Sequence, residues 1–253
     1  MGVWDIYSSR ITAKGSTKRG ATLQREKGFL LRHTKDSLSY QECVVDGEDR
    51  VASIINSDNL DEKTIISLPD EDLRHGALVE WMGNKWLIVE RDANTTVYTK
   101  CKMKQCNHFL QWVDTSGKIC GQWAIVSDGT KYLTGEFEDR NFIVSRGDTR
   151  LSVTISRTED ALKLDRTNRF LIDDVDCHEH LAYSLTKPLR MGSVYNGNGV
   201  FSFVMQEVET TDDDNFELLI ADYYKYYPRP DNDTSGTPII GGSDTSDDRK
   251  VWI

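Results

Sequence analysis

The chain has little that would place it in a membrane or in an oxidising compartment. No apolar run approaches the roughly 20 residues that a helix needs to cross a bilayer. The N-terminus has no apolar segment typical of a secretory signal. The cysteine count is five, an odd number, so a framework of disulfides is not expected. These absences predict reduced cysteines that pack as small hydrophobes, in an intracellular protein or a part of an assembly.

The sequence motifs of common enzymes are missing as well. There is no glycine loop that would cradle phosphate, no Gly-x-Ser-x-Gly turn and no kinase signature. Carboxylates are frequent, but no pair stands out as a catalytic acid and base. We therefore predict a protein that is not an enzyme and that needs no cofactor.

The densest set of possible metal ligands surrounds His178 and His180. In a strand these two side chains would lie on one face, as a metal site requires. Neither this set nor the series Cys101, Cys106 and Cys120 has the spacing of an established metal motif. A polar loop or strand edge is therefore the favoured interpretation of the histidine segment, and core packing that of the cysteines.

The charge of the chain, −10 overall, is distributed unevenly. Residues 1–40 carry eight basic and three acidic side chains, a balance of +5, which leaves −15 for the remainder. Such asymmetry is typical of a basic arm that reaches an acidic partner, although a basic surface helix explains it equally well. We expect a short helix over residues 4–11, followed by a loop or extended arm over residues 14–22, where Gly15 and Gly20 lie. The basic residues expected to contact a neighbouring subunit are Arg10, Lys14, Lys18, Arg19 and Arg25.

Residues 76–126 are rich in tryptophan and patterned as strands. Apolar runs at 77–82 and 85–90 flank Gly83-Asn84, a pair that tolerates the positive φ of a tight hairpin. Residues 97–103 alternate apolar and polar, and the runs 108–113 and 119–126 predict a second hairpin around residues 115–117. Each tryptophan buries roughly 150–250 Å². The expected core residues are Trp81, Trp86, Trp112 and Trp123.

Further short strands define the predicted fold class and domains. They are expected at residues 38–45, 50–55, 64–68, 151–155, 169–172, 181–185 and 200–205. Short strands at this spacing indicate a mainly β protein made of small barrel or sandwich modules with short helices. We divide the chain into an extended basic N-terminal arm (1–37), a tryptophan-rich β module (38–140), a second β module (141–227) and an acidic C-terminal tail (228–253).

The tail has the composition of a linker but ends in an apolar triplet, Val251, Trp252 and Ile253. We expect this triplet to pair as an edge strand with its own body or with a neighbouring subunit. An ordinary frayed end is the alternative.

Two blocks of the sequence contain short motifs of one kind of protein. The first block comprises GALVEW (76–81), WLIV (86–89), VYTK (97–100) and CNHFLQW (106–112). The second comprises GDTRL (147–151), RFLI (169–172), FVM (203–205) and IADY (220–223). Both blocks resemble head–tail connector proteins of tailed bacteriophages, the head-closure or stopper proteins of the neck. Together they cover roughly residues 40–226. The acidic tail and the greater chain length depart from many closure proteins, so closure, adaptor and tail-completion rings remain open.

The resemblance implies a β-barrel subunit that repeats in a ring around the channel through which DNA leaves the head. The implied partners are further copies of the chain, a portal or adaptor protein on the head side, and a tail or tail-terminator protein on the tail side. DNA would pass without specific contacts, because an acidic body lacks the cations that bind phosphate. The implied location is the virion neck, after synthesis in the host bacterial cytoplasm. A loop of a stopper protein blocks the channel, and the candidates are residues 114–118, 157–169 and 192–199.

Two alternatives belong to other classes of function. A β-barrel binding module would use the four core tryptophans as a stacking platform for sugar or single-stranded nucleic acid. A metal hydrolase would use Asp173, Asp174, His178 and His180.

Overall fold

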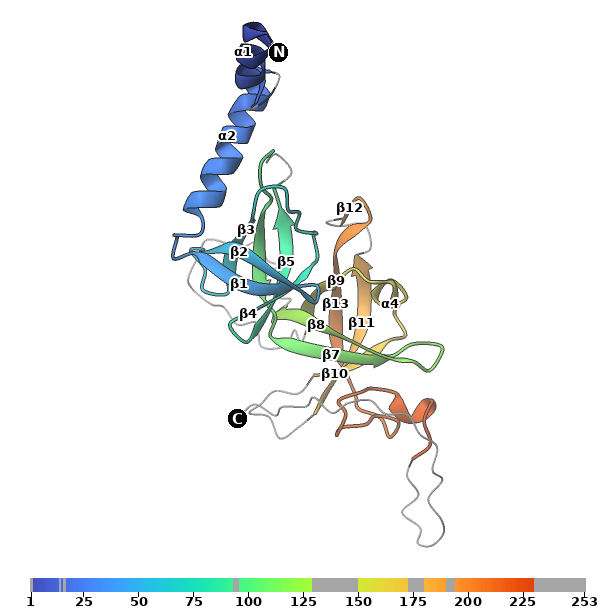
Figure 1. The fold of residues 1–253 in the computed structure, drawn as a ribbon. Coiled ribbons are helices and arrows are strands. Elements are labelled where there is room, and N and C mark those ends of the chain that lie inside the picture. The colour runs from blue at the N-terminus through green and yellow to red at the C-terminus, as the bar shows by residue number, and fades with distance from the viewer. Residues whose placement is uncertain are drawn as a thin grey trace, which may run out of the picture.

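The fold is mainly β, and its strands form two barrel-like sheets that follow a helical N-terminal arm (Figure 1). The computed structural model describes residues 2–13, 15, 17–92, 96–128, 150–172, 180–189 and 194–229. The arm consists of α1 (Val3–Thr12) and α2 (Lys18–His33). This architecture agrees with the predicted fold class of small β modules with short helices.

The first sheet is a closed barrel. Its strands are β1 (Tyr40–Val45), β2 (Glu48–Asn56), β3 (Glu62–Ser67), β4 (Leu78–Trp81), β5 (Asn84–Arg91) and β6 (Lys100–Gln105). They follow the order β1-β2-β3-β6-β5-β4, and β4 pairs with β1 to close the ring of strands. Apolar and polar residues alternate along β6. Cys101 and Met103 therefore point into the barrel core, whereas the lysines that alternate with them face out.

Two tight turns fix the register of the barrel hairpins. Asp46 and Gly47, with φ of 50° and 84°, join β1 to β2 as their sequence predicts. Met82 and Gly83, with φ of 48° and 76°, join β4 to β5, so this turn begins one residue earlier than the predicted Gly83-Asn84. Positive φ at both central residues is the geometry whose twist matches paired strands.

The second sheet is seven-stranded and curls on itself. Its strands are β7 (His108–Val113), β8 (Ile119–Asp128), β9 (Arg150–Ser156), β10 (Arg169–Ile172), β11 (Leu181–Leu189), β12 (Val194–Tyr195) and β13 (Asn198–Val208). The order is β10-β11-β13-β9-β8-β7, with β12 paired to β13. Trp112 of β7 and Phe170 of β10, from opposite ends of this order, place their ring centroids 6.0 Å apart. The short helices α4 (Glu159–Leu162) and η1 (Tyr223–Lys225) lie outside the sheet path.

The predicted tryptophan core is divided between the two sheets. Trp86 is buried in the barrel core, with Trp81 packed against it at 5.9 Å between ring centroids. Trp112 is buried in the core of the second sheet. Trp123 packs on a third cluster that contains both barrel and sheet residues. The change from barrel to second sheet falls between Gln105 and His108, so residues 108–128 belong with the later strands.

A tight seam joins the barrel to the second sheet. Leu87 of β5 and Cys106 pack with Ile125 of β8 and Val200 of β13 in the shared cluster. Ser156 Oγ of β9 donates to the carbonyl oxygen of Gly76 at 2.6 Å. Gly76 has φ of +80°, and a Cβ on it would lie 1.9 Å from the carbonyl oxygen of Gly199. Glycine is therefore required where the backbones of the two sheets approach.

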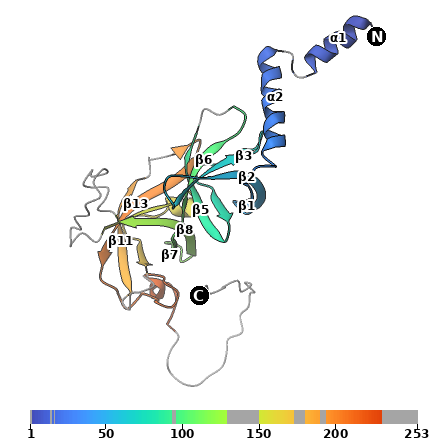
Figure 2. The same cartoon turned by 90° about the vertical axis from the view of Figure 1, so that its left-hand side faces the viewer.

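The prediction of an extended or looped segment over residues 14–22 is wrong from Lys18 onwards, because α2 begins there. The expected short helix over residues 4–11 corresponds to α1 and is confirmed. Thr17 caps α2 by accepting from the N–H of Gly20 at 3.1 Å, so this glycine lies in the first helical turn instead of a loop. The arm projects from the barrel as two helices (Figures 1 and 2).

Candidate functional site

The α1–α2 arm exposes side chains that a folded chain normally buries. Trp4 is 80% exposed, and Val3, Ile6 and Tyr7 are exposed with it. The rings of Trp4 and Tyr7 meet edge to face at 6.0 Å between centroids, so they shield each other only in part. A cluster of large apolar side chains on a projecting helix is typical of a surface that binds a partner.

The second helix of the arm has no buried residue. Most of the stability of helices in proteins comes from tertiary packing, and α2 gains little of it from the chain's own body. Its basic residues Lys18, Arg25 and Arg32 follow one another at intervals of seven and lie on one line of the helix, with Phe29 between the last two. We call these four residues the basic stripe.

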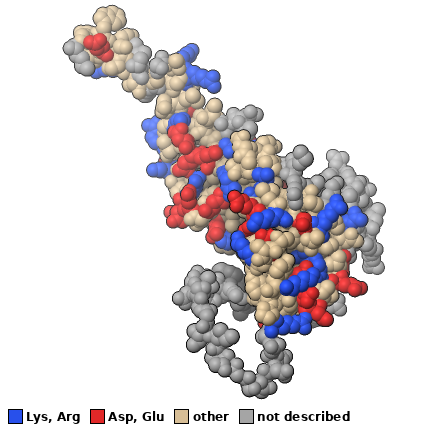
Figure 3. Space-filling view, turned by 90° about the vertical axis from the view of Figure 1, so that its right-hand side faces the viewer, with Lys and Arg blue, Asp and Glu red and all other residues tan. Residues whose placement is uncertain are grey.

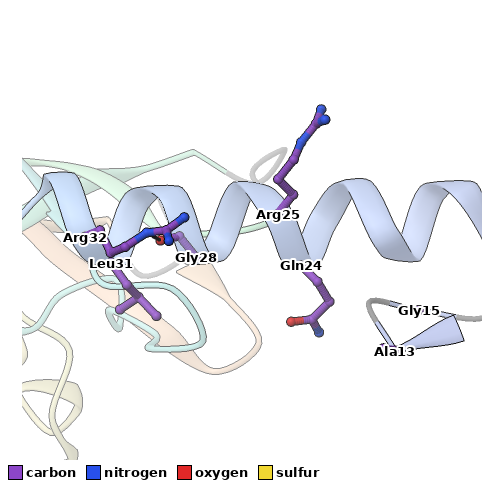
Figure 4. Close-up of a pocket in the computed structure, with 7 residues that line it drawn as sticks. All are labelled: Ala13, Gly15, Gln24, Arg25, Gly28, Leu31 and Arg32. Atoms are coloured by element: carbon purple, nitrogen blue, oxygen red, sulfur yellow. Dashed lines mark hydrogen bonds between the residues drawn. The ribbon is translucent and has the colours of Figure 1, made fainter. Parts of the chain in front are cut away.

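The opposite face of α2 is the one that meets the barrel. Lys27 forms an ion pair with Asp70, which follows β3. Because successive residues rotate by about 100°, Lys27 and Arg25 point in nearly opposite directions. Figure 4 shows Arg25 directed to one side of α2 and Gln24 to the other. The basic stripe therefore faces away from the chain's own body.

A glycine bend sets the angle between the two helices of the arm. Gly15 has φ of +130°, and a Cβ on it would lie 2.7 Å from backbone atoms of Gly20 and Ala21. The bend encloses an open groove of about 640 Å³ next to α2. Its lining comprises Ala13, Gly15, Gln24, Arg25, Gly28, Leu31 and Arg32 (Figure 4).

An acidic groove of about 670 Å³ lies on the barrel. Pairing of β1 with β2 and β4 brings Glu42, Val44, Asp49 and Glu80 together along it, and Glu71 borders it from the loop after β3. Val44, Val51 and Leu68 supply apolar surface. Among the described residues that line it, Arg50 is the one with a basic side chain, and it already pairs with Glu48. The groove combines an apolar floor with a negative rim.

Charge is separated between the arm and the barrel. Figure 3 shows Lys and Arg along the arm, with Asp and Glu gathered on the body next to its base. Residues 40–105, which form the barrel, contain 13 acidic and 8 basic side chains, a balance of −5. The two surfaces have the opposite signs that electrostatic recognition needs.

Two clusters of charged residues in the second sheet hold the structure together. Arg169 binds both carboxylate oxygens of buried Asp214, at 3.0 and 3.1 Å, and Asp222 at 2.8 Å. Asp114 accepts from Lys163 at 3.1 Å. Burial opposes ionisation of Asp214, but the N–H groups of Thr211 and Asp222 and the charge of Arg169 lower its pKa. These carboxylates are fixed by their partners and are not free to act as acids or bases.

The described residues do not form a metal site, and two of the buried cysteines are unsuited to be reactive thiols. His180 is exposed and stacks on Phe216 at 4.8 Å between centroids, whereas His178, Asp173 and Asp174 lie outside the described residues. Within the described ranges no group of three His, Cys, Asp or Glu residues could hold a metal ion. Burial raises the pKa of both the Cys101 and Cys106 thiols to about 12, which is opposite to what a reactive thiolate requires.

The tryptophans are poor candidates for a ligand platform. Trp86 and Trp112 are 3% and 2% exposed, so neither ring face is open to a sugar or a base. Trp81 and Trp123 are half-buried against core clusters. A stacking platform needs exposed aromatic faces. Burial of these rings disfavours the binding-module alternative.

The predicted interface residues are placed by the structure only in part. Arg10, Lys18, Arg19 and Arg25 are exposed on the arm helices. Lys14, Val251, Trp252 and Ile253 lie outside the described residues.

Sequence reasoning did not include Phe29 and Arg32 among the interface residues of the arm. It also did not predict the acidic groove. The seven-residue spacing of the basic stripe was the signal that could have revealed the first two, because it is a helical period. The groove had no such signal, since it depends on pairing between strands that are distant in the sequence.

Comparisons of the chain with protein-family models, with curated proteins and with solved structures give no match. Among the described residues there is also no helix with the length and apolar character needed to cross a membrane. The functional argument therefore depends on the geometry of the chain itself.

Proposed function

We propose that the chain is a structural protein of the neck of a tailed bacteriophage. Its copies form a ring between the portal or adaptor and the tail, close the filled head and let DNA pass at ejection. The observation that carries this proposal is the α1–α2 arm, which projects from a β-barrel body. No residue of α2 is buried, and Trp4 and Tyr7 of α1 are exposed. The resemblance of two sequence blocks to neck proteins supplies the type of assembly.

The arm supports assembly because its stability depends on a partner. An exposed helix with a basic line on one face and apolar residues at its tip gains packing free energy only against another molecule. Ring subunits contact their neighbours through unlike surfaces, and a projecting element on one side of the body is suited to such a contact.

The charge of the body fits a channel that conducts DNA. Protein surfaces hold duplex DNA chiefly through lysine and arginine contacts to phosphate. A barrel with a balance of −5 and a chain with −10 overall would repel DNA and allow it to slide. The basic residues of the arm are then available for protein contacts.

The β12–β13 hairpin is the best candidate for the loop that blocks the channel. Residues 114–118 are tied down, since Tyr227 donates to the carbonyl oxygen of Gly117 at 2.6 Å. Residues 157–169 include buried Ala161 and Leu164. Tyr195, at the turn of the β12–β13 hairpin, is 65% exposed, although its ring lies 5.4 Å from that of His75 and Arg157 donates to the carbonyl oxygen of Gly197 at 2.6 Å.

Electron microscopy of the protein mixed with candidate portal rings, or in its native particle, tests this function. We expect a ring of this chain stacked on the portal at the base of the capsid. A ring found only at the tail end would assign it to tail completion instead. A monomer that never associates with portal, adaptor or tail rings would contradict a role in the neck.

A further inference from the structure

The basic stripe on α2 has no ion-pair partner within the described part of the chain, where the contacts of Arg32 and Phe29 stay within α2: Arg32 donates to the carbonyl oxygen of Gly28, and the ring of Phe29 lies 4.1 Å from that of His33. Lys18, Arg25 and Arg32 are exposed and make no ion pair there, and Phe29 between them is 50% exposed. Consecutive cations are about 10 Å apart along the helix, so the stripe is roughly 20 Å long. The ion pair of Lys27 with Asp70 links the other face of α2 to the loop after β3. The stripe is thus presented outward, where the chain's own barrel does not reach it.

The acidic groove on the barrel has complementary chemistry. Glu42, Asp49 and Glu71 are exposed at the groove and make no ion pair with other described residues. Val44 and Leu68 offer the apolar contact that a ring such as Phe29 would need. The groove has carboxylates around an apolar floor, and the stripe has cations around an aromatic ring, so the two surfaces are complementary. In such interfaces the buried aromatic side chain supplies binding free energy, and the charges determine which partner binds.

We propose that the basic stripe of one copy docks in the acidic groove of the next copy. Each copy carries both surfaces, so the contact is head-to-tail and can repeat around a closed ring. Phe29 packs on the floor of the groove, and Lys18, Arg25 and Arg32 meet the carboxylates. The inference rests on the proposed function, because it names the contact by which neck subunits would join.

Charge reversal provides the test. Variant A carries Lys18→Glu, Arg25→Glu and Arg32→Glu, and variant B carries Glu42→Lys, Asp49→Lys and Glu71→Lys. All six positions are exposed, so both variants are expected to fold, which circular dichroism verifies. Self-association is measured by sedimentation velocity, with and without candidate portal rings. Each variant alone is expected to associate about tenfold more weakly than wild type or worse.

An equimolar mixture of variants A and B distinguishes a contact between two copies from a contact within one chain. In the mixture the intact stripe of B faces the intact groove of A, and the two reversed surfaces also carry opposite charges. We expect the mixture to regain assembly, with A and B alternating. A contact within one chain would not be restored by mixing, so failure of the mixture to assemble would overturn the proposal.

A matched control reverses three exposed acids outside the groove, Asp58→Lys, Glu207→Lys and Glu217→Lys. It changes the net charge as variant B does and should assemble like wild type. If wild type forms rings and both A and B assemble equally well, the docking proposal fails while the neck function stands. If wild type neither self-associates nor binds portal rings, the neck function itself fails.

Discussion

Arg169 is the residue that fastens the segment after β13 to the second sheet. Its guanidinium binds Asp214, Asp222 and the hydroxyl of Thr211, and it donates to the carbonyl oxygen of Glu209. The side chain of Asp214 has no exposed surface. A buried carboxylate is tolerated here because two backbone N–H groups and a bidentate arginine supply the hydrogen bonds that water would otherwise make to it.

Replacing Arg169 by Ala should therefore be costly. The variant leaves the carboxylate of Asp214 buried without its cation, and we expect the free energy of unfolding to fall by about 3 kcal/mol. Urea denaturation measures the change. Arg166→Ala, an exposed change in the turn just before β10, is the control and should have little effect. Equal stability of both variants would show that the arginine cluster does not hold this segment.

Asp114 gives the protein a predictable response to acid. The hydrogen bond from Lys163 is the largest cause that lowers its pKa, against the effect of burial. A lowered pKa in the folded state means stability that is present above the unfolded value of about 3.9 and lost as the pH falls through the folded value. The stability advantage of wild type over Asp114→Asn should therefore be constant above about pH 5 and shrink as the pH falls through about 3.9 and below. Denaturation curves across that range test it, with Asp58→Asn as an exposed control; a constant difference for Asp114→Asn would contradict it.

At the scale of elements, the sequence predicts local structure well and long-range pairing poorly. The hairpin around Asp46-Gly47 could be placed because a two-residue turn depends on the turn residues alone. The pairing of β3 with β6 and of β1 with β4 could not, because it joins segments separated by other strands. Helix α2 was missed because Gly15 and Gly20 indicate a loop, whereas Thr17 caps a helix that includes Gly20. In the candidate site, individual basic residues were foreseen but their common face was not.

The close approach of Gly76 to the backbone of Gly199 predicts that a side chain at position 76 destabilises the contact between the barrel and the second sheet. Gly76→Ala and Gly47→Ala both place a side chain at positive φ, +80° and +84°, but only the first meets a carbonyl oxygen at 1.9 Å. We expect about 1 kcal/mol of destabilisation for Gly47→Ala from backbone strain, and a loss of about 3 kcal/mol or more for Gly76→Ala. Thermal denaturation of the pair gives the comparison. Similar midpoints would mean that the two backbones are not in contact.

At the scale of the whole molecule, the barrel and the second sheet share a core and should unfold together. Leu87 is fully buried among residues of both sheets. Calorimetry of wild type should show one cooperative transition. Leu87→Ala should cost about 2–5 kcal/mol and separate the unfolding of the two sheets, whereas Ile65→Ala, buried in the barrel core alone, should lower the midpoint of a single transition. Two transitions in wild type would contradict the coupling.

The closed barrel has a further consequence if the chain assembles in many copies, as proposed. Open sheet edges present unpaired N–H and C=O groups, and crowded copies can fuse through them into amyloid-like stacks. Pairing of Val44 with Glu80 and of Val45 with Val79 joins β1 to β4, which closes the barrel and leaves fewer unpaired backbone groups along its edge. High local concentration therefore favours contacts through side chains over uncontrolled addition of strands. The same two residue pairs that complete the barrel also protect it from aggregation.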